Sequence, residues 1–167
     1  MRSTIKIVIL LFFICTSMSG ASFPDMEKYM RQHALIWEQL PMQWNEGAFL
    51  GNGLVGMMVY ADSTLNALVF HLGRPDVTDH RKAPYRKTSI GTEEADKMVD
   101  FCRLDVGKML LFPEGKILSG TFYLDIYNAE LTGHLKTDKG DLTFHAYTPQ
   151  PEEVNIVEVS SGVPYRW

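Results

Sequence analysis

The chain contains very little cysteine. Only Cys15 and Cys102 occur among its 167 residues, and Cys15 lies in an N-terminal segment that we expect to be removed. Cys102 then has no partner within the chain, so an intramolecular disulfide is excluded. Its position on the apolar face of an expected helix favours a buried, unreactive thiol. The folded chain must therefore depend on its apolar core.

Positive charge is also scarce. The sequence has 16 Lys and Arg against 20 Asp and Glu, which gives a formal net charge of −4. Binding to a nucleic-acid backbone depends on Lys and Arg neutralising phosphates, and no basic stripe is present here. We therefore expect no nucleic-acid partner. The sequence also contains no internal repeat and no low-complexity tract.

Long apolar runs are absent apart from residues 7–15. That run is shorter than the roughly 20 residues that a membrane-spanning helix needs. Arg2 and Lys6 are the only charges before Asp25. A basic start followed by a short apolar run is typical of a secretory signal peptide. The alternative, a buried N-terminal helix or strand, does not explain why both early charges are basic.

The small residues Ser19 and Ala21 suit the −3 and −1 positions of a cleavage site, so the sequence predicts a signal peptide over residues 1–21. The remaining chain, 22–167, is expected to be exported to the periplasm or the extracellular space, the cell surface included. No stable membrane insertion is expected after signal removal. Lipidation of Cys15 is an alternative, which the large residues just before it disfavour.

The second half of the chain predicts strand after strand. Short alternating segments separated by turn signals are typical of a β-sandwich. We predict a mostly β fold, an antiparallel β-sandwich with one or two short helices, forming one domain over 22–167. The expected strands are 54–60, 64–72, 104–112, 120–127, 130–137, 141–147 and 154–159.

Other segments are expected to be less regular. Residues 24–37 fit either one helical face or the beginning of an edge strand. A helix is expected to begin at Thr92, whose side chain can cap it, after a long polar loop over 73–91. The last residues, 161–167, look like the start of another element, so the sequence predicts a chain truncated at its C terminus.

Residues 47–56 are dense in glycine, and Gly51, Gly53 and Gly56 mimic part of a dinucleotide-binding fingerprint. That motif requires a strand before it and a helix after it, whereas a strand is expected to follow here. A tight turn into that strand explains the glycines. Trp44, Asn45 and Glu46 just upstream favour a sugar-binding function, because an aromatic ring packs on a sugar face while polar groups bind its hydroxyls.

Residues 44–59, WNEGAFLGNGLVGMMV, resemble the opening of the N-terminal β-sandwich in glycoside hydrolases of family 95, the α-L-fucosidase-like proteins. Phe49 stands where that family typically has proline. The strand at 68–72 leading into Asp76 and Asp79 is similar to the next part of that domain. The later strands, up to residue 160, also resemble its sequence of hairpins.

The resemblance implies an exported carbohydrate-active protein whose sandwich precedes an (α/α)6 barrel. In such inverting enzymes the acid and base groups lie in the barrel and are about 6.5–9.5 Å apart. No position of this chain matches the catalytic motif, so no catalytic residue and no cofactor is predicted. The expected partner is a glycan substrate that the missing barrel holds. Whether the chain is part of an enzyme is left open.

The loop that contains Asp76, Asp79, His80 and Arg81 has the densest cluster of chemical groups. Together with Trp44, Glu46 and Asn52, these residues form the predicted substrate-binding set. The loop is expected to lie at a site rim or between domains, or to be a plain solvated loop. Its spacing fits no known calcium or zinc motif, so no metal site is predicted.

Two other functions remain open at this point. The chain could be a free-standing carbohydrate-binding module, which requires an exposed aromatic platform on one sheet face. It could also be a purely structural domain of the cell envelope. Binding to glycans would separate these two alternatives.

Overall fold

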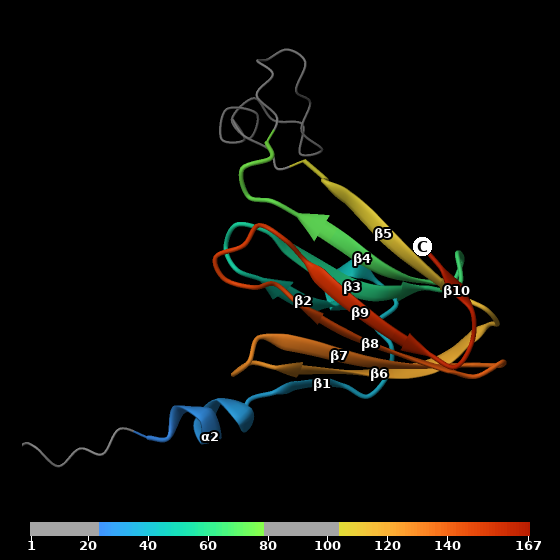
Figure 1. Ribbon diagram of the computed structural model, residues 1–167, viewed down its shortest axis with the longest axis horizontal. Coiled ribbons are helices and arrows are strands. Elements are labelled where there is room, and N and C mark those ends of the chain that lie inside the picture. The colour runs from blue at the N-terminus through green and yellow to red at the C-terminus, as the bar shows by residue number, and fades with distance from the viewer. Residues whose placement is uncertain (1–23, 79–103) are drawn as a thin grey trace, which may run out of the picture.

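The computed structural model describes residues 24–78 and 104–167. The predicted signal peptide, both cysteines and the helix expected from Thr92 lie outside the described residues. The described chain forms two antiparallel sheets that stack in two layers (Figure 1). The predicted antiparallel β-sandwich is confirmed, and it carries two short helical segments, α2 (Met26–Arg31) and the 3-10 helix η1 (Trp44–Glu46).

Each sheet has five described strands. The first sheet has the order β1-β6-β7-β8-β9 and the second has the order β10-β5-β4-β3-β2. The first sheet consists of β1 (Leu35–Trp37), β6 (Ile117–Asp125), β7 (Glu130–Thr137), β8 (Asp141–Tyr147) and β9 (Ile156–Ser161). The second consists of β2 (Ala48–Gly51), β3 (Gly56–Asp62), β4 (Ala67–Gly73), β5 (Gly107–Pro113) and β10 (Tyr165–Arg166).

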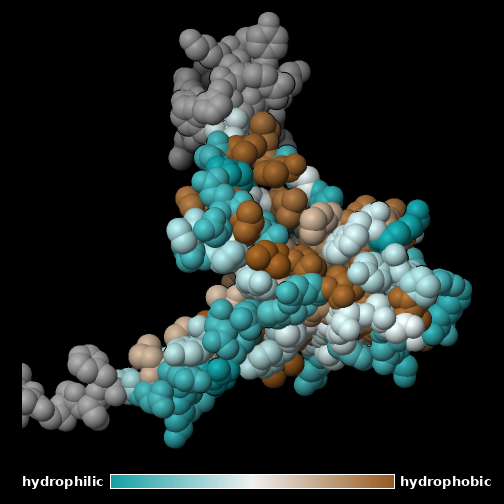
Figure 2. All heavy atoms as spheres, in the orientation of Figure 1, coloured by the Kyte–Doolittle hydropathy of each residue, from teal (hydrophilic) through white to brown (hydrophobic). Residues whose placement is uncertain are grey.

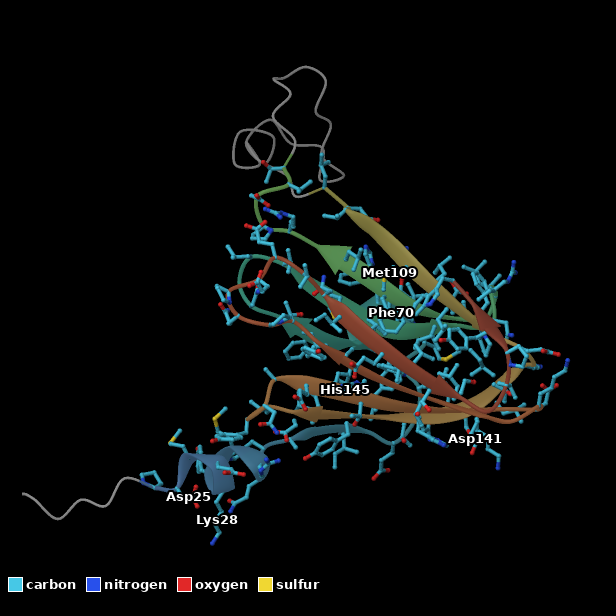
Figure 3. All side chains as sticks on the ribbon, viewed as in Figure 1. Asp25, Lys28, Phe70, Met109, Asp141 and His145 are labelled. Atoms are coloured by element: carbon cyan, nitrogen blue, oxygen red, sulfur yellow. The ribbon has the colours of Figure 1, made fainter. Side chains whose placement is uncertain are left out.

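Three phenylalanine rings from three strands form the centre of the core between the sheets. The ring centroid of Phe144 lies 5.5 Å from that of Phe70 and 5.4 Å from that of Phe122, both edge to face, which is a favourable aromatic geometry. Gly133 lies opposite both Phe122 and Phe144 in the register of the first sheet. A Cβ at Gly133 would overlap the ring of Phe144. Phe70 is labelled in Figure 3, together with Met109 of the neighbouring strand.

The hairpin of β7 and β8 has the bounds that the sequence predicts. The backbone N–H of Thr137 donates to the carbonyl oxygen of Gly140 at 2.9 Å. Gly140 has a φ of 150°, a value that glycine adopts readily. The clean alternation of buried and exposed residues on both strands explains why this register could be predicted from the sequence.

The hairpin of β3 and β4 differs from the prediction. We expected residues 61–63 to connect the two strands, but β3 continues to Asp62 and the connection is 63–66. The carboxylate of Asp62 accepts hydrogen bonds from the backbone N–H groups of Thr64 (2.9 Å) and Leu65 (3.0 Å). Asn66 completes the turn with a φ of 53°. Asp and Asn favour such turns because their side chains bond to nearby backbone groups.

Both alternatives for residues 24–37 occur, one after the other. A helix comes first, with Asp25 accepting from the backbone N–H of Lys28 at 3.2 Å, and the edge strand β1 follows. The helix buries no side chain. It is attached to the sandwich by Arg31, whose Nη1 donates to Oδ2 of Asp125 at 2.6 Å. In Figure 3, Asp25 at the start of α2 and Lys28 on α2 lie away from the core.

Candidate functional site

Three loops meet at one end of the sandwich. They are the turn between β2 and β3 (52–55), the segment after β4 (74–78) and the loop between β8 and β9 (148–155). Asn52 is bonded to the third loop, and Arg74 of the second loop is also bonded to it. Figure 1 shows these turns at the left-hand end of the sandwich. We call this group of residues the loop cluster.

Asn52 is the main link within the loop cluster. Its Nδ2 donates to the carbonyl oxygens of Pro149 (2.8 Å) and Glu152 (2.7 Å). Its Oδ1 accepts from the backbone N–H groups of Leu54 (3.0 Å) and Val55 (3.1 Å). Both polar atoms of the side chain are therefore engaged within the protein. Asn52 positions two loops, and its contact with a sugar stays a prediction.

Asp76 belongs to a charged group in the same cluster. The guanidinium of Arg74 donates to both carboxylate oxygens of Asp76, each at 2.8 Å, and to Oε2 of Glu153 at 2.5 Å. The hydrogen bonds from Arg74 lower the pKa of the Asp76 carboxyl, although partial desolvation opposes them. Both carboxylates raise the pKa of Arg74, the bond to Asp76 most strongly. Arg74 and Asp76 are thus both charged at neutral pH.

A hollow lies beside these residues. It has a volume of about 400 Å³, within the lower part of the range of small-molecule sites, about 300–1,000 Å³. Glycine backbone forms much of its wall, which allows a ligand to approach the main chain closely. The lining residues are Gly53, Val55, Gly56, Gly73, Arg74, Pro75 and Leu104.

The structure separates the predicted substrate-binding residues into groups. Asn52 and Asp76 lie at the same end of the sandwich. Trp44 and Glu46 lie in η1, which precedes β2, whereas Asn52 follows β2. The length of this four-residue strand, about 13 Å, therefore separates Trp44 and Glu46 from Asn52. Trp44 is 61% exposed, and the carbonyl oxygen of Glu46 accepts from Nε1 of Trp37 at 2.9 Å. The remaining three, Asp79, His80 and Arg81, lie outside the described residues.

Sequence reasoning missed several residues of the loop cluster. Arg74 was treated only as part of a polar loop, and residues 148–153 only as a connection between strands. Gln150 and Glu153 were therefore not predicted as site residues. Nε2 of Gln150 donates to the carbonyl oxygen of Asn52 at 2.6 Å. Only the two prolines at 149 and 151 mark this loop in the sequence, and they do not indicate what it contacts.

The outer face of the second sheet is a further feature. Side chains alternate between the two faces of a strand, and Val59 and Phe70 point into the core. The intervening positions therefore face outward, and the pairing places them side by side across β2, β3, β4 and β5. Apart from His71 and Lys108, the large residues there are apolar: Phe49, Met58, Tyr60, Val69, Leu110 and Phe112. Tyr60 and Val69 are buried within the chain, and the other four are exposed or half-buried. We call these six the apolar outer face.

The outer face of the first sheet is polar by comparison. His145 on β8 lies between two carboxylates, with Nδ1 3.2 Å from Glu158 and Nε2 3.3 Å from Glu130. Figure 3 shows His145 and Asp141 at their places along this strand. The exposed positions nearby carry hydroxyl, imidazole and charged groups: Thr121, Thr132, His134, Lys136, Thr143 and Ser160. Ile36 and Tyr123, at the β1 side of this sheet, are exposed apolar or aromatic exceptions.

Comparison with known proteins gives no match from which a function could be inferred. The function is therefore inferred from the loop cluster and the outer faces of the two sheets. No protein-family model matches the chain, and no curated protein matches it. No helix within residues 24–78 and 104–167 is long and apolar enough to span a membrane. Among those residues, no group of three or more His, Cys, Asp or Glu side chains is arranged to hold a metal ion.

Proposed function

We propose that this chain is the N-terminal β-sandwich of an exported carbohydrate-active protein. The sandwich packs through its apolar outer face on the catalytic (α/α)6 barrel of a glycoside hydrolase. Its loop cluster shapes the rim of the substrate site, and the chain is not catalytic alone. The resemblance of residues 44–59 to family 95 proteins supports this proposal.

The observation that carries the proposal is the apolar outer face. Antiparallel sheets that face water normally carry polar residues on that side, as the exposed positions of β7 and β8 do. Phe49 is 55% exposed, and it lies beside Met58 in the pairing of β2 and β3. Met58, Leu110 and Phe112 are half-buried, whereas Tyr60 and Val69 are buried within the chain. The apolar surface that this face offers to another protein body is therefore that of Phe49, Met58, Leu110 and Phe112.

The loop cluster supports the second part of the proposal. Sugar sites combine a hollow with a few polar groups that fix the hydroxyls. The hollow that Arg74 lines supplies the first, and Asp76 and Glu153 place carboxylate oxygen atoms against this lining residue. The hydrogen bonds of Asn52 hold these loops in place, as a site rim requires.

Binding to a barrel tests the docking proposal. The purified chain is mixed with the (α/α)6 barrel of a family 95 α-L-fucosidase that is produced without its own sandwich, and complex formation is followed by sedimentation velocity. We expect a one-to-one complex that Phe49→Lys weakens at least tenfold, because a buried charge without a partner is costly. The matched control is Ile36→Lys on β1 of the first sheet, where Ile36 is 66% exposed and the complex should be unchanged. Absence of a complex, or equal weakening by both variants, would contradict the proposal.

Turnover tests the statement that the chain is not catalytic alone. The purified chain is incubated with a panel of aryl glycosides, and release of the aryl group is measured. We expect no hydrolysis, because the resemblance places the acid and base groups in the barrel. Measurable hydrolysis by the chain itself would overturn the proposal.

A free-standing carbohydrate-binding module is the second candidate, and the exposure of Trp44 favours it. Exposed aromatic side chains are suited to packing against sugar rings. A glycan array separates the two candidates. Binding that is lost in Trp44→Ala would support the module, whereas no binding by the chain alone agrees with a sandwich that works only beside its barrel.

A further inference from the structure

Asn52 is followed by glycine, and no other asparagine in the sequence is. Asparagine before glycine is prone to spontaneous deamidation, because glycine has no Cβ that would keep its backbone nitrogen away from the neighbouring side-chain amide. Asn52 is half-buried in the structure, whereas Gly53 is exposed and has a φ of 92°. The reactive pair therefore lies at the surface of the loop cluster.

The backbone nitrogen of Gly53 is available for this reaction. Its N–H donates to no residue in the described part of the chain, and Gly53 lines the hollow of the loop cluster. Figure 2 shows hydrophilic residues at the left-hand end of the sandwich, where Figure 1 places the loop cluster. Water, the second reactant of deamidation, therefore reaches this turn.

The side-chain amide of Asn52 is held in place, unlike the nitrogen of Gly53. Nδ2 donates to the carbonyl oxygens of Pro149 and Glu152, and Oδ1 accepts from the N–H groups of Leu54 and Val55. Deamidation requires the plane of the amide to turn its face toward the attacking nitrogen. The hydrogen bonds of Asn52 oppose this rotation, so the reaction requires the loop cluster to open first.

The covalent step involves only the pair and water. The backbone nitrogen of Gly53 loses its proton to solvent base and bonds to Cγ of Asn52, while the Cγ–Nδ2 bond breaks and Nδ2 leaves as ammonia. Water then opens the cyclic imide at either carbonyl carbon. Opening at the side-chain carbonyl gives aspartate, and opening at the main-chain carbonyl gives isoaspartate. The sum of both steps is the exchange of an amide for a carboxylate, with water consumed and ammonia released.

Neither product restores the contacts of Asn52. In aspartate, a carboxylate oxygen replaces Nδ2 and has no hydrogen to donate to the carbonyl oxygens of Pro149 and Glu152, which costs the desolvation of these groups. In isoaspartate, a methylene group lengthens the main chain between residues 52 and 53, so the turn into β3 also changes. The β8–β9 loop loses its attachment in both cases.

We propose that Asn52 and Gly53 form a deamidation site that the folded loop cluster protects, and that its conversion irreversibly releases the β8–β9 loop. The reaction proceeds from the open form of the loop cluster, so its rate reports how often these loops separate. This inference rests on the hydrogen bonds of Asn52 and is independent of the proposed binding of a barrel or a sugar.

Comparison of the folded and the unfolded chain tests the protection. The purified chain is kept in mildly alkaline buffer with and without guanidinium chloride, and is then cleaved with trypsin. Residues 32–73 contain no Lys or Arg, so one peptide that ends at Arg74 carries Asn45, Asn52 and Asn66. Fragment spectra of this peptide locate the aspartate and isoaspartate products.

We expect Asn52 to convert at least about tenfold faster in guanidinium chloride than in native buffer, because only opening of the loops frees its amide. In the unfolded chain it should also convert faster than Asn45 and Asn66, which precede other residues than glycine. Equal or faster conversion of Asn52 in the folded chain, or no conversion in the unfolded chain, would overturn the proposal.

A variant of the facing loop tests whether the loop contact gives the protection. Nε2 of Gln150 donates to the carbonyl oxygen of Asn52 at 2.6 Å, so Gln150→Ala weakens the contact and leaves the reactive pair unchanged. We expect conversion in native buffer to rise at least about threefold, with the rate in guanidinium chloride unchanged. Gln43→Ala is the matched control, because Gln43 is exposed and its side chain makes no capping bond. No acceleration by Gln150→Ala, or equal acceleration by both variants, would contradict the protection.

Asn52→Asp reproduces one product and tests the release of the loop. A protease that cleaves after glutamate is added to the folded chain, and cleavage after Glu152 and Glu153 is followed by mass spectrometry. We expect cleavage of Asn52→Asp to be at least about fivefold faster than that of the parent, because a released loop opens to the protease more often. Asn45→Asp adds the same charge in the exposed η1 and should be cleaved like the parent. Cleavage of Asn52→Asp at the rate of the parent would overturn the proposal.

Discussion

Nδ2 of Asn52 donates to the carbonyl oxygen of Pro149 at 2.8 Å, a hydrogen bond between residues 97 positions apart in the sequence. A second bond from the same amide reaches Glu152. Asn52 also holds its own turn, so one side chain determines how the β2–β3 turn and the β8–β9 loop face each other. The shape of the loop cluster therefore depends on this residue.

Replacing Asn52 should destabilise the protein and loosen the loop cluster. Asn52→Ala removes two donated and two accepted hydrogen bonds, and we expect a loss of about 2–4 kcal/mol in the free energy of unfolding. Urea denaturation measures this change. Asn45→Ala is the matched control, because Asn45 is exposed in η1 and should change stability by less than about 0.5 kcal/mol. Equal effects of the two variants would show that Asn52 does not link the loops.

Gly133 should tolerate no side chain. The ring of Phe144 occupies the position that a Cβ at Gly133 requires, so Gly133→Ala overpacks the core and should cost about 1–3 kcal/mol. Gly73→Ala is the control, since nothing lies within 4 Å of a Cβ at that position. Thermal unfolding should show a lower midpoint for Gly133→Ala alone. An unchanged midpoint would mean that the aromatic core is looser than described.

Asp125 should make the protein sensitive to acid. Desolvation, the largest single influence, raises the pKa of this carboxyl, but the backbone N–H groups of Asn128 and Tyr127 and the charge of Arg31 together lower it below its ordinary value. A lowered folded-state pKa stabilises the protein above about pH 4, and this contribution is lost as the pH falls through the folded-state value. The free energy of unfolding should therefore decrease below about pH 4.

Two variants test this acid dependence by chemical denaturation at a series of pH values. Asp125→Asn removes the titrating group, so its free energy of unfolding should decrease less steeply in acid than that of the parent. Arg31→Met removes one of the groups that lower the pKa of Asp125, so the decrease should be smaller and should be complete at a higher pH than in the parent. Parallel curves for all three proteins would contradict the assignment.

The sandwich could be predicted from the sequence where local signals were sufficient. β7 and β8 alternate cleanly around a turn that ends at Gly140, so both strands were predicted with their observed bounds. β2 was not predicted, because Gly47, Gly51 and Gly53 around it indicate a turn rather than a strand. The register of a strand with few side chains is set by its partner, here β3, and that pairing is not local.

Less of the candidate site than of the fold could be predicted from the sequence. The glycine turn with Asn52 was recognised as a feature, but its partners Pro149 and Glu152 lie on another sheet's loop. Trp44 precedes the turn closely in sequence, yet β2 separates the two in space. Contacts of this kind arise from the stacking of the two sheets, and a single sequence carries no signal for them.

Side-chain footprinting of the apolar outer face tests the central claim most directly. The chain is oxidised with hydroxyl radicals alone and in the presence of the (α/α)6 barrel, and modification is read by mass spectrometry. The account predicts that oxidation of Phe49 and Met58 falls at least fivefold in the complex, while oxidation of Tyr123 on the first sheet is unchanged. Protection of Tyr123 instead, or no protection at any of the three residues, would contradict it.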